Sequence, residues 1–397
     1  MIATQTDRTP RRRRAAFKAF SLLFGLLVAC LLAEGCARLY FSSSSHRAYE
    51  TTRLLLAGEV PETGDRDGVM GQPYLLYIPA PGYRDHNEQG YRGKAVPMQR
   101  TSGVSRVLCL GGSTTYGYMA KRPGSSYPAQ LEEILKQELP TGVDDVDVIN
   151  AGVVDATTAE LLTHYHFKYH YFRPDVVVIN TGRNDPEVGE YYQPDYSHAR
   201  HPMQVPQPLS QFGRTVVQSR LAALIVLKML YGRNPGNAWI ERDDELPPPT
   251  VWHPNAKNAN ADRTLDDSEL AFTHNLNSLI NEIERDGARV LLVPVRLNPH
   301  EARKEEQFQY IARHERILSQ LATERGLLLA PFPADVITPR NWADGTHLSS
   351  DGSREKAEYL APLVRRLLWP DASEQAQTDS QPPPHADALG APTIDRR

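Results

Sequence analysis

The chain is poor in cysteine and has no excess of basic residues. Only three of its 397 residues are cysteines. Neither they nor the histidines show the short, clustered spacings of a disulfide framework or a zinc site. The formal net charge is -4, without the broad basic field that nucleic-acid-binding proteins carry, so we expect no nucleic-acid partner. With 23% charged and 40% hydrophobic residues, the composition is ordinary for a globular protein and leaves room for more than one domain.

One long apolar run lies near the N-terminus. Four arginines, Arg11 to Arg14, precede an apolar segment from Ala15 to Ala37 that contains Lys18 and Glu34. Its charge-free part, Ala19 to Ala33, is shorter than the ~20 residues of a membrane span. Lys18 can extend its ammonium group toward the lipid headgroups and so lengthen the usable stretch. Basic residues before an apolar run keep the N-terminus in the cytoplasm.

Three interpretations of this run stay open. A retained signal anchor over residues 1–41 is favoured, because no small-residue cleavage site follows the run cleanly. A lipoprotein signal is suggested by the lipobox-like sequence Leu27-Val28-Ala29-Cys30, although apolar residues continue beyond Cys30. A buried core helix is disfavoured, since the arginines would then have no partner. With an anchor, everything after Phe41 lies outside the membrane.

The rest of the chain predicts an α/β fold. Residues 42–105 are rich in Gly, Pro and Arg without a clear period, and we interpret them as a stalk and lead-in. From residue 106 onward, short apolar runs bounded by turn residues read as buried parallel strands alternating with amphipathic helices. We therefore expect a three-layer α/β/α sandwich with a central parallel five-stranded sheet, flavodoxin-like in type, over residues 106–370. The expected strands are Arg106–Leu110, Val146–Asn150, Asp175–Thr181, Arg289–Val295 and Gly326–Ala330.

Helices are predicted between these strands. Ser126 is a candidate cap for the first helix, and Thr157 with Glu160 has capping-box spacing for the second. Later helices are expected near 265–285, 304–325 and 350–368. Residues 187–262 interrupt the order as an insertion, whose apolar stretch Val216–Leu230 predicts a lid, a membrane-facing helix or, preferably, a core-packed helix. The Gln-, Pro- and Ala-rich tail 371–397 predicts disorder.

A candidate nucleophile follows the first strand. Gly111 and Gly112 permit a sharp turn directly after the apolar run, and Ser113 stands just beyond it, where a parallel sheet places functional groups. A serine hydroxyl needs a base and oxyanion donors to react. A plain strand-to-helix turn is the alternative. A phosphate loop is excluded because Tyr118 stands where lysine is required, and the G-x-S-x-G elbow breaks at Thr115.

The candidate base is His347. Asp344 precedes it by three positions, a spacing at which the carboxylate can accept from Nδ1–H and leave Nε2 free to face Ser113. A helix cap beside an exposed imidazole is the alternative interpretation. His166 and His170 are four residues apart on a predicted helix, but no third ligand is evident, so we predict no metal and no cofactor.

These residues resemble the SGNH hydrolase (GDSL-type esterase) superfamily, of the membrane-anchored bacterial type. Four blocks occur in order, covering about residues 106–368. Gly112 replaces the aspartate that many members have before the serine. The blocks are Gly111-Gly112-Ser113-Thr114-Thr115, Asn150-Ala151-Gly152, Gly182-Arg183-Asn184-Asp185 and Asp344-Gly345-Thr346-His347.

The resemblance implies roles for five residues. Ser113, Asp344 and His347 would form the catalytic triad. The backbone N–H groups of Ser113 and Gly152 and the side-chain amide of Asn184 would form the oxyanion hole. Glycine suits position 152 because a side chain there would block the reacting carbonyl, whereas Asp185 is expected to support the loop.

The function expected is hydrolysis of an acyl or acetyl ester through an acyl-enzyme. The substrate would be a small-molecule, carbohydrate or lipid ester. The protein would be a single-pass inner-membrane protein with a periplasmic catalytic domain, unless it is a lipoprotein. Two alternatives remain: an acyltransferase to carbohydrate hydroxyls in envelope polysaccharide modification, and a non-catalytic envelope component with the same fold.

Overall fold

The computed structural model describes residues 9–43, 47–59, 68–72, 74–121, 123–185, 208–231, 264–301 and 305–370. Two compact units are present. The first unit comprises residues 1–95, 153–168 and 183–275, and the second comprises 96–152, 169–182 and 276–397. Most of the predicted insertion, at 187–207 and 232–262, and the predicted disordered tail 371–397 lie outside the described residues.

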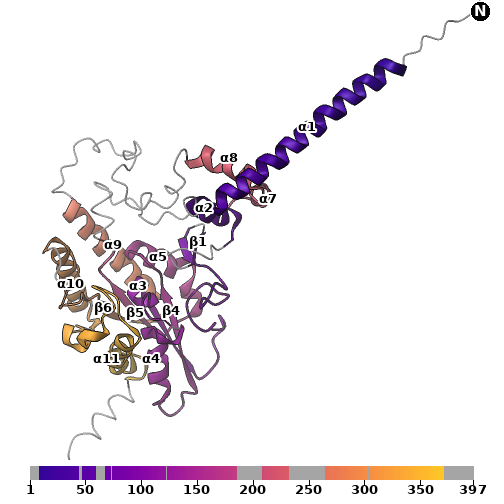
Figure 1. The fold of residues 1–397 in the computed structure, drawn as a ribbon. Helices are drawn as coiled ribbons and strands as arrows, with labels where there is room; N and C mark the ends of the chain where they lie inside the picture. The colour runs from indigo at the N-terminus through magenta and orange to yellow at the C-terminus, as the bar shows by residue number, and fades with distance from the viewer. Residues whose placement is uncertain are drawn as a thin grey trace, which may run out of the picture. The chain divides into compact units, whose positions relative to one another are not determined.

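The second unit is built on a parallel sheet of five strands (Figure 1). The strand order is β4-β3-β5-β6-β7, which confirms the predicted central sheet. Nearly every strand residue is buried, so both faces of the sheet must be covered by other elements. The strands are β3 (Val104–Gly111), β4 (Asp145–Gly152), β5 (Val176–Thr181), β6 (Arg289–Pro294) and β7 (Leu328–Leu329).

Helices supply that cover. On one face, α4 (Tyr127–Lys136) and α11 (Ser350–Leu368) pack against alternate residues of the strands. α10 (Glu305–Arg325) packs on β6 and β7, and Arg325 links it to Asn281 of α9 (Thr264–Arg285) at 2.7 Å. The helix face shared by α4 and α11 contains Leu131, Ile134, Leu135, Ala357, Leu360, Ala361 and Val364.

The strand order fixes where a site can form. Of the strands in this sheet, β3 comes first in the chain, yet in space it lies between β4 and β5. The chain adds β4 on one side of β3 and then crosses over to add β5, β6 and β7 on the other side. Gly111 at its end pairs with both Gly152 of β4 and Asn180 of β5. A crevice opens beyond the carboxyl ends of strands at such a switch point, and Ser113 follows β3 there.

The first unit contains α1 (Thr9–Ser42), α2 (Arg47–Ala57), α5 (Thr158–Phe167), α7 (Gln211–Val216) and α8 (Arg220–Tyr231). An antiparallel hairpin joins β1 (Val69–Gln72) to β2 (Leu76–Pro79). The stretch interpreted as a stalk therefore holds a helix and a hairpin, with Tyr77 and Tyr91 fully buried. Its short elements and frequent turns gave no period to detect.

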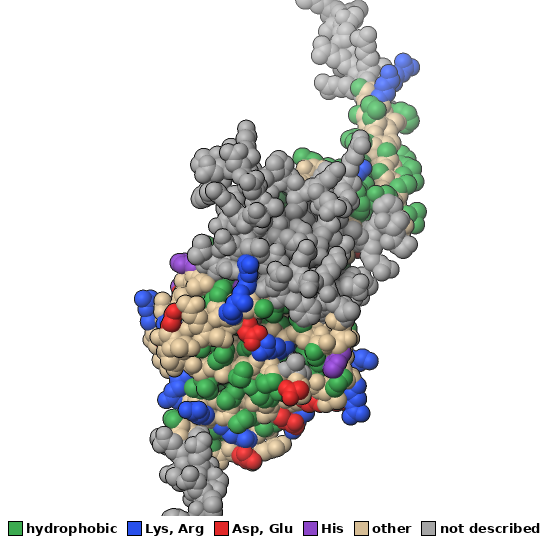
Figure 2. All heavy atoms as spheres, turned by 90° about the vertical axis from the view of Figure 1, so that its left-hand side faces the viewer, with side chains coloured by type: hydrophobic (Ala, Val, Ile, Leu, Met, Phe, Trp, Pro, Cys, Tyr) green, Lys and Arg blue, Asp and Glu red, His purple; other side chains and the backbone are tan. Residues whose placement is uncertain are grey.

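α1 is a single continuous helix. Within it, Arg14–Ser42 is long and apolar enough to cross a membrane, and none of its most apolar window is buried. Figure 2 shows apolar side chains along its length, with basic side chains near its N-terminal end. An apolar surface of this extent is unfavourable in water.

α5 begins as predicted. The backbone N–H of Thr157 donates to the Glu160 carboxylate at 2.8 Å, and the reciprocal half of the capping box is also present. Asp185 accepts from the backbone N–H of Thr158 at 2.9 Å, so this carboxylate supports the start of α5.

Candidate active site

Ser113 begins the four-residue helix α3 (Ser113–Tyr116), directly after the turn that ends β3. Glycine is required in this turn, because a Cβ on Gly111 would lie 2.1 Å from Thr115 Oγ1 and 2.6 Å from the Asn180 carbonyl oxygen. The first N–H groups of a helix have no acceptor within it, so the Ser113 amide is not used by α3 itself.

His347 lies in the loop between η9 (Pro339–Asn341) and α11, and it meets Ser113 directly. Its Nε2 is 2.8 Å from Ser113 Oγ, and its Nδ1 is 2.7 Å from Asp344 Oδ2. The structure thus brings the three residues of the predicted triad into one series of hydrogen bonds.

Asp344 also shapes the loop that carries His347. Its Oδ1 accepts from the backbone N–H groups of Thr346 and His347, each at 2.7 Å. The carboxylate therefore holds the main chain with one oxygen and the imidazole with the other. This is why an aspartate three positions before the histidine is effective: the same short turn fixes both partners.

The Asp344 carboxylate is held in its ionised form. Partial burial opposes ionisation, but the hydrogen bonds from the His347 side chain and from the backbone of His347 and Thr346 outweigh it and place the pKa of Asp344 well below its ordinary value. An ionised carboxylate can only accept. Nδ1 of His347 must then donate, which leaves the Nε2 lone pair to accept from the Ser113 hydroxyl.

Tyr118 packs against the imidazole, a contact that no motif in the sequence indicated. Its ring centroid lies 5.3 Å from that of His347, with a tilt of 44°. This aromatic contact adds to the hydrogen bond from Asp344 in restricting the imidazole.

Gly152 lies at the end of β4, beside α3. A Cβ there would lie 2.1 Å from the backbone nitrogen of Tyr116. The glycine is therefore required for the close approach of two backbones, and the expectation that it also leaves space for a reacting carbonyl stays a prediction. Its N–H donates to Asn150 Oδ1 at 3.0 Å.

Asn184 belongs to the first unit, whereas Ser113, Gly152, Asp344 and His347 belong to the second. Its side-chain amide donates to the carbonyl oxygen of Ala156 at 2.9 Å. It lies in the turn after β5, next to Asp185, where the sequence placed it.

A buried lysine underlies the serine turn and was missed at the sequence level. Lys356 of α11 is 3% exposed, and its Nζ donates to Asn180 Oδ1 at 2.7 Å. The same oxygen accepts from Thr114 Oγ1 at 3.1 Å. Burial lowers the pKa of Lys356 to about 7. Its ammonium also lies 4.4 Å from the centre of the Tyr127 ring.

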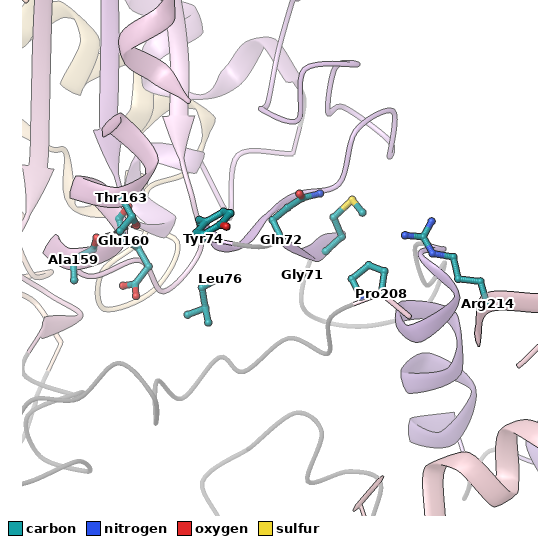
Figure 3. Close-up of a pocket in the computed structure, with 10 residues that line it drawn as sticks. Gly71, Gln72, Tyr74, Leu76, Ala159, Glu160, Thr163, Pro208 and Arg214 are labelled. Atoms are coloured by element: carbon teal, nitrogen blue, oxygen red, sulfur yellow. Dashed lines mark hydrogen bonds between the residues drawn. The ribbon is translucent and has the colours of Figure 1, made fainter. Parts of the chain in front are cut away.

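The first unit has a separate cavity of about 660 Å³ (Figure 3). It opens between the β1–β2 hairpin, α5 and α7, and its lining is mainly apolar. None of the triad residues lines it. The lining residues are Met70, Gly71, Gln72, Tyr74, Leu76, Ala159, Glu160, Thr163, Pro208 and Arg214. Over the described part of the chain, no three His, Cys, Asp or Glu side chains gather in a way that could hold a metal ion.

The comparison with family models identifies a family for this chain. The family model described as GDSL-like lipase/acylhydrolase matches residues 109–355, whereas no curated protein matches the chain. Among solved structures, TesA is 18% identical, with a TM-score of 0.41, over 66% of this chain and 100% of its own. A catalytic mutant of Axe2, an acetylxylan esterase from Geobacillus stearothermophilus, is 17% identical, with a TM-score of 0.38, over 67% of this chain and 94% of its own.

The matched segment runs from the last residues of β3 to the first turns of α11 and so contains Ser113, Asp344 and His347 together. It covers more than half of the chain. The chain belongs to the GDSL-like lipase/acylhydrolase family and is a serine ester hydrolase.

Proposed function

We propose that the protein hydrolyses a carboxylic ester through an acyl-enzyme formed on Ser113, on the outer side of the cytoplasmic membrane. The observation that carries this proposal is the continuous series Ser113 Oγ, His347 Nε2, His347 Nδ1 and Asp344 Oδ2, with contacts of 2.8 and 2.7 Å. A series of this kind activates a hydroxyl that is otherwise a weak nucleophile.

In the first half-reaction, Ser113 Oγ attacks the ester carbonyl carbon while His347 Nε2 takes the hydroxyl proton. The resulting tetrahedral intermediate carries an oxyanion. Its collapse breaks the bond to the alcohol oxygen, which leaves with the proton from His347. Asp344 remains ionised throughout and stabilises the imidazolium.

In the second half-reaction, water replaces the alcohol. His347 takes a proton from the water, whose oxygen attacks the acyl-serine carbonyl. Collapse of the second intermediate releases the carboxylic acid and returns the proton to Ser113 Oγ.

The oxyanion donors proposed from the family resemblance are the N–H groups of Ser113 and Gly152 and the amide of Asn184. Two of these groups donate elsewhere in this structure, Gly152 to Asn150 and Asn184 to Ala156. The proposal therefore requires both to exchange these acceptors for the oxyanion. Each such donor contributes about 2.7–4 kcal/mol to lowering the barrier.

Labelling with a fluorophosphonate probe tests the nucleophile. We expect the full-length protein to be labelled, Ser113→Ala to lose all labelling, and His347→Ala to lose nearly all of it. Ser319→Ala, on the outer part of α10, is the matched control and should label normally. Undiminished labelling of Ser113→Ala would rule the proposal out.

Hydrolysis and acyl transfer share the acyl-enzyme, so the acceptor is measured separately. Esters of p-nitrophenol with increasing acyl length are offered with and without an added oligosaccharide. A rate of acid release that stays the same when the oligosaccharide is added supports hydrolysis. Transfer of the acyl group to the oligosaccharide at a higher rate than release of the free acid identifies the acyltransferase alternative.

The proposed location is supported by α1. Arginines precede an apolar helix, the arrangement that keeps the N-terminus inside. Cys30 lies within continuous helix, twelve residues before Ser42 where α1 ends, which favours a retained anchor over processing at that cysteine. Ala37 and Phe41 near the end of α1 are buried, so this end is part of the folded first unit.

Cysteine accessibility tests this topology. With Cys30 and Cys36 changed to alanine, Glu133→Cys on α4 should react with a membrane-impermeant maleimide in intact spheroplasts. Thr6→Cys, ahead of the arginines, should react only after lysis. The reverse pattern would place the catalytic unit inside the cell.

A further inference from the structure

The short helix α8 is attached to α1 through Glu34, in the C-terminal part of α1. The Glu34 carboxylate accepts from Ser219 Oγ at 2.8 Å and from the backbone N–H groups of Arg220 and Leu221 at 3.1 and 3.0 Å. These amides open α8, and they have no acceptor within the helix. A side chain of α1 thus caps α8, and its negative charge is favourable at that helix end.

Further contacts fix α8 in place. Arg220 pairs with Glu50 of α2 at 2.9 Å, and Glu50 also pairs with Arg53 at 2.8 Å. In addition to these ion pairs, Ala223 and Leu227 of α8 are buried in a small apolar core with Phe41 of α1. α8 is therefore held by α1 and α2 and is not a free lid.

The opposite face of α8 is also apolar but is not buried. Met229 is 80% exposed, Leu230 56% and Ile225 52%, and Phe212 of the preceding α7 is 80% exposed. Arg220 and Lys228 are the only charged side chains in α8. Grouped apolar side chains that water reaches mark an interaction surface.

The position of Glu34 sets the depth of this surface. The charge-free part of α1 ends immediately before Glu34. In a helix that crosses a bilayer, a carboxylate at the end of the apolar stretch lies at the lipid–water interface, because transfer into hydrocarbon is costly. The first turn of α8 is bonded to that carboxylate, so it lies at the same level.

The direction of α8 relative to α1 determines how α8 meets a membrane. In the view of Figure 1, α8 is not parallel to α1 and extends to one side of it near the C-terminal end of α1. A helix that starts at the interface and runs across a membrane-spanning helix extends along the membrane surface. Lys228 can then reach the lipid phosphates while its neighbours enter the acyl region.

We propose that α8, with Phe212 of α7, lies in the outer lipid–water interface of the bilayer that α1 crosses, with Ile225 and Met229 among the acyl chains. This inference rests on the membrane anchorage proposed above. The occupant of the apolar face is lipid, since α8 is bonded to Glu34 at the end of the charge-free part of α1 and packs on the same helix.

Depth-dependent quenching tests the inference on the full-length protein in nanodiscs. In a background with Cys30 and Cys36 changed to alanine, single cysteines carry an environment-sensitive fluorophore. Met229→Cys reports on α8, Leu31→Cys is the positive control within α1, and Thr323→Cys on α10 is the water-exposed control. Thermal unfolding of each labelled variant checks that it is folded.

We expect blue-shifted emission at position 229 relative to position 323, and loss of most of that emission when nitroxide lipids are included. Quenching at 31 but not at 229 would overturn the inference and leave the anchor intact. A blue shift at 229 without lipid quenching would mean that protein, such as a second copy of the chain, covers the face, and would also overturn it. No quenching at 31 would refute the anchor as well. Phe212→Cys repeats the measurement from α7 if labelling at 229 disturbs the fold.

Discussion

The Nε2 atom of His347 lies 2.8 Å from Ser113 Oγ, although 234 positions separate the two residues in the chain. Each residue is placed by its own local turn, one closed by glycines after β3 and the other held by the Asp344 carboxylate. Because both turns are set locally, a substitution can perturb one of them without the other.

Asp344→Asn should abolish most turnover without unfolding the protein. The amide oxygen can still accept from the backbone N–H groups of Thr346 and His347, so the loop should persist. Its NH₂ group, however, would donate toward Nδ1 and favour the imidazole tautomer with a proton on Nε2. We expect kcat to fall about 10⁴-fold, the scale found for this change in other serine hydrolases.

The measurement is kcat on an aryl ester beside the thermal unfolding midpoint. Asp335→Asn, on an exposed carboxylate outside the loop, is the matched control and should keep both values. Full turnover in Asp344→Asn would contradict the assigned role.

Gly152→Ala should destabilise the protein and inactivate it. The added Cβ would lie 2.1 Å from the Tyr116 nitrogen, and neither backbone can move freely. Overpacking of this kind costs about 1–3 kcal/mol. Chemical denaturation measures the loss, and Gly124→Ala, where a Cβ meets nothing within 4 Å, should show none. Equal stability of the two variants would mean that β4 and α3 are not in close contact.

Asn184→Ala should lower kcat by about 10²–10³ if its amide serves the oxyanion. The lost hydrogen bond to Ala156 should cost only about 1 kcal/mol of stability. Asn184→Asp keeps the shape but places a negative charge near the oxyanion, so its kcat should fall at least as far. A variant that loses stability but keeps kcat would assign Asn184 a structural role only.

Lys356→Met should change how stability depends on pH. The pKa of Lys356 is lowered by burial from 10.5 to about 7, so between these values the unfolded chain binds the additional proton. Stability of the native protein then rises with pH across this window, and the rise is absent in the variant. Burial also raises the pKa of the Cys109 thiol to about 12, but this thiol is present in both proteins, so its opposing contribution cancels when their stabilities are subtracted.

Thermal unfolding of both proteins from pH 7 to 10.5 provides the measurement. The midpoint of the native protein minus that of Lys356→Met should increase with pH. A difference that stays constant over the window would show that the lysine is charged throughout it.

Much of the second unit could be predicted because its determinants are local. Apolar runs predicted all five strands, although β7 is shorter than expected, with only Leu328–Leu329 paired. The capping box of Thr157 and Glu160 formed as predicted, since it needs only four consecutive residues. Ser126 is the N-cap of α4 but makes no capping bond, because its Oγ accepts from the distant Asn150 at 3.2 Å.

What the sequence could not supply were partners from other parts of the chain. Lys356 reads as a solvent-exposed charge, yet it shares a helix face with the buried Gly352 and Leu360. The four-residue spacing of these three positions was the feature of the sequence that could have identified Lys356 as buried. The apolar stretch at 216–230 predicted a helix correctly but not its neighbours α1 and α2, because an apolar face does not specify what covers it.

The pairing of Gly111 with strands on both sides has a kinetic consequence. Backbone amides of a central strand exchange with solvent only when the whole sheet opens, whereas frayed ends and loops exchange through local openings. We therefore expect Ser113, which follows this strand, to keep its position until the sheet of the second unit unfolds. Heat or denaturant should abolish fluorophosphonate labelling of Ser113 in the same cooperative transition in which the sheet unfolds, and not at a lower temperature or denaturant concentration.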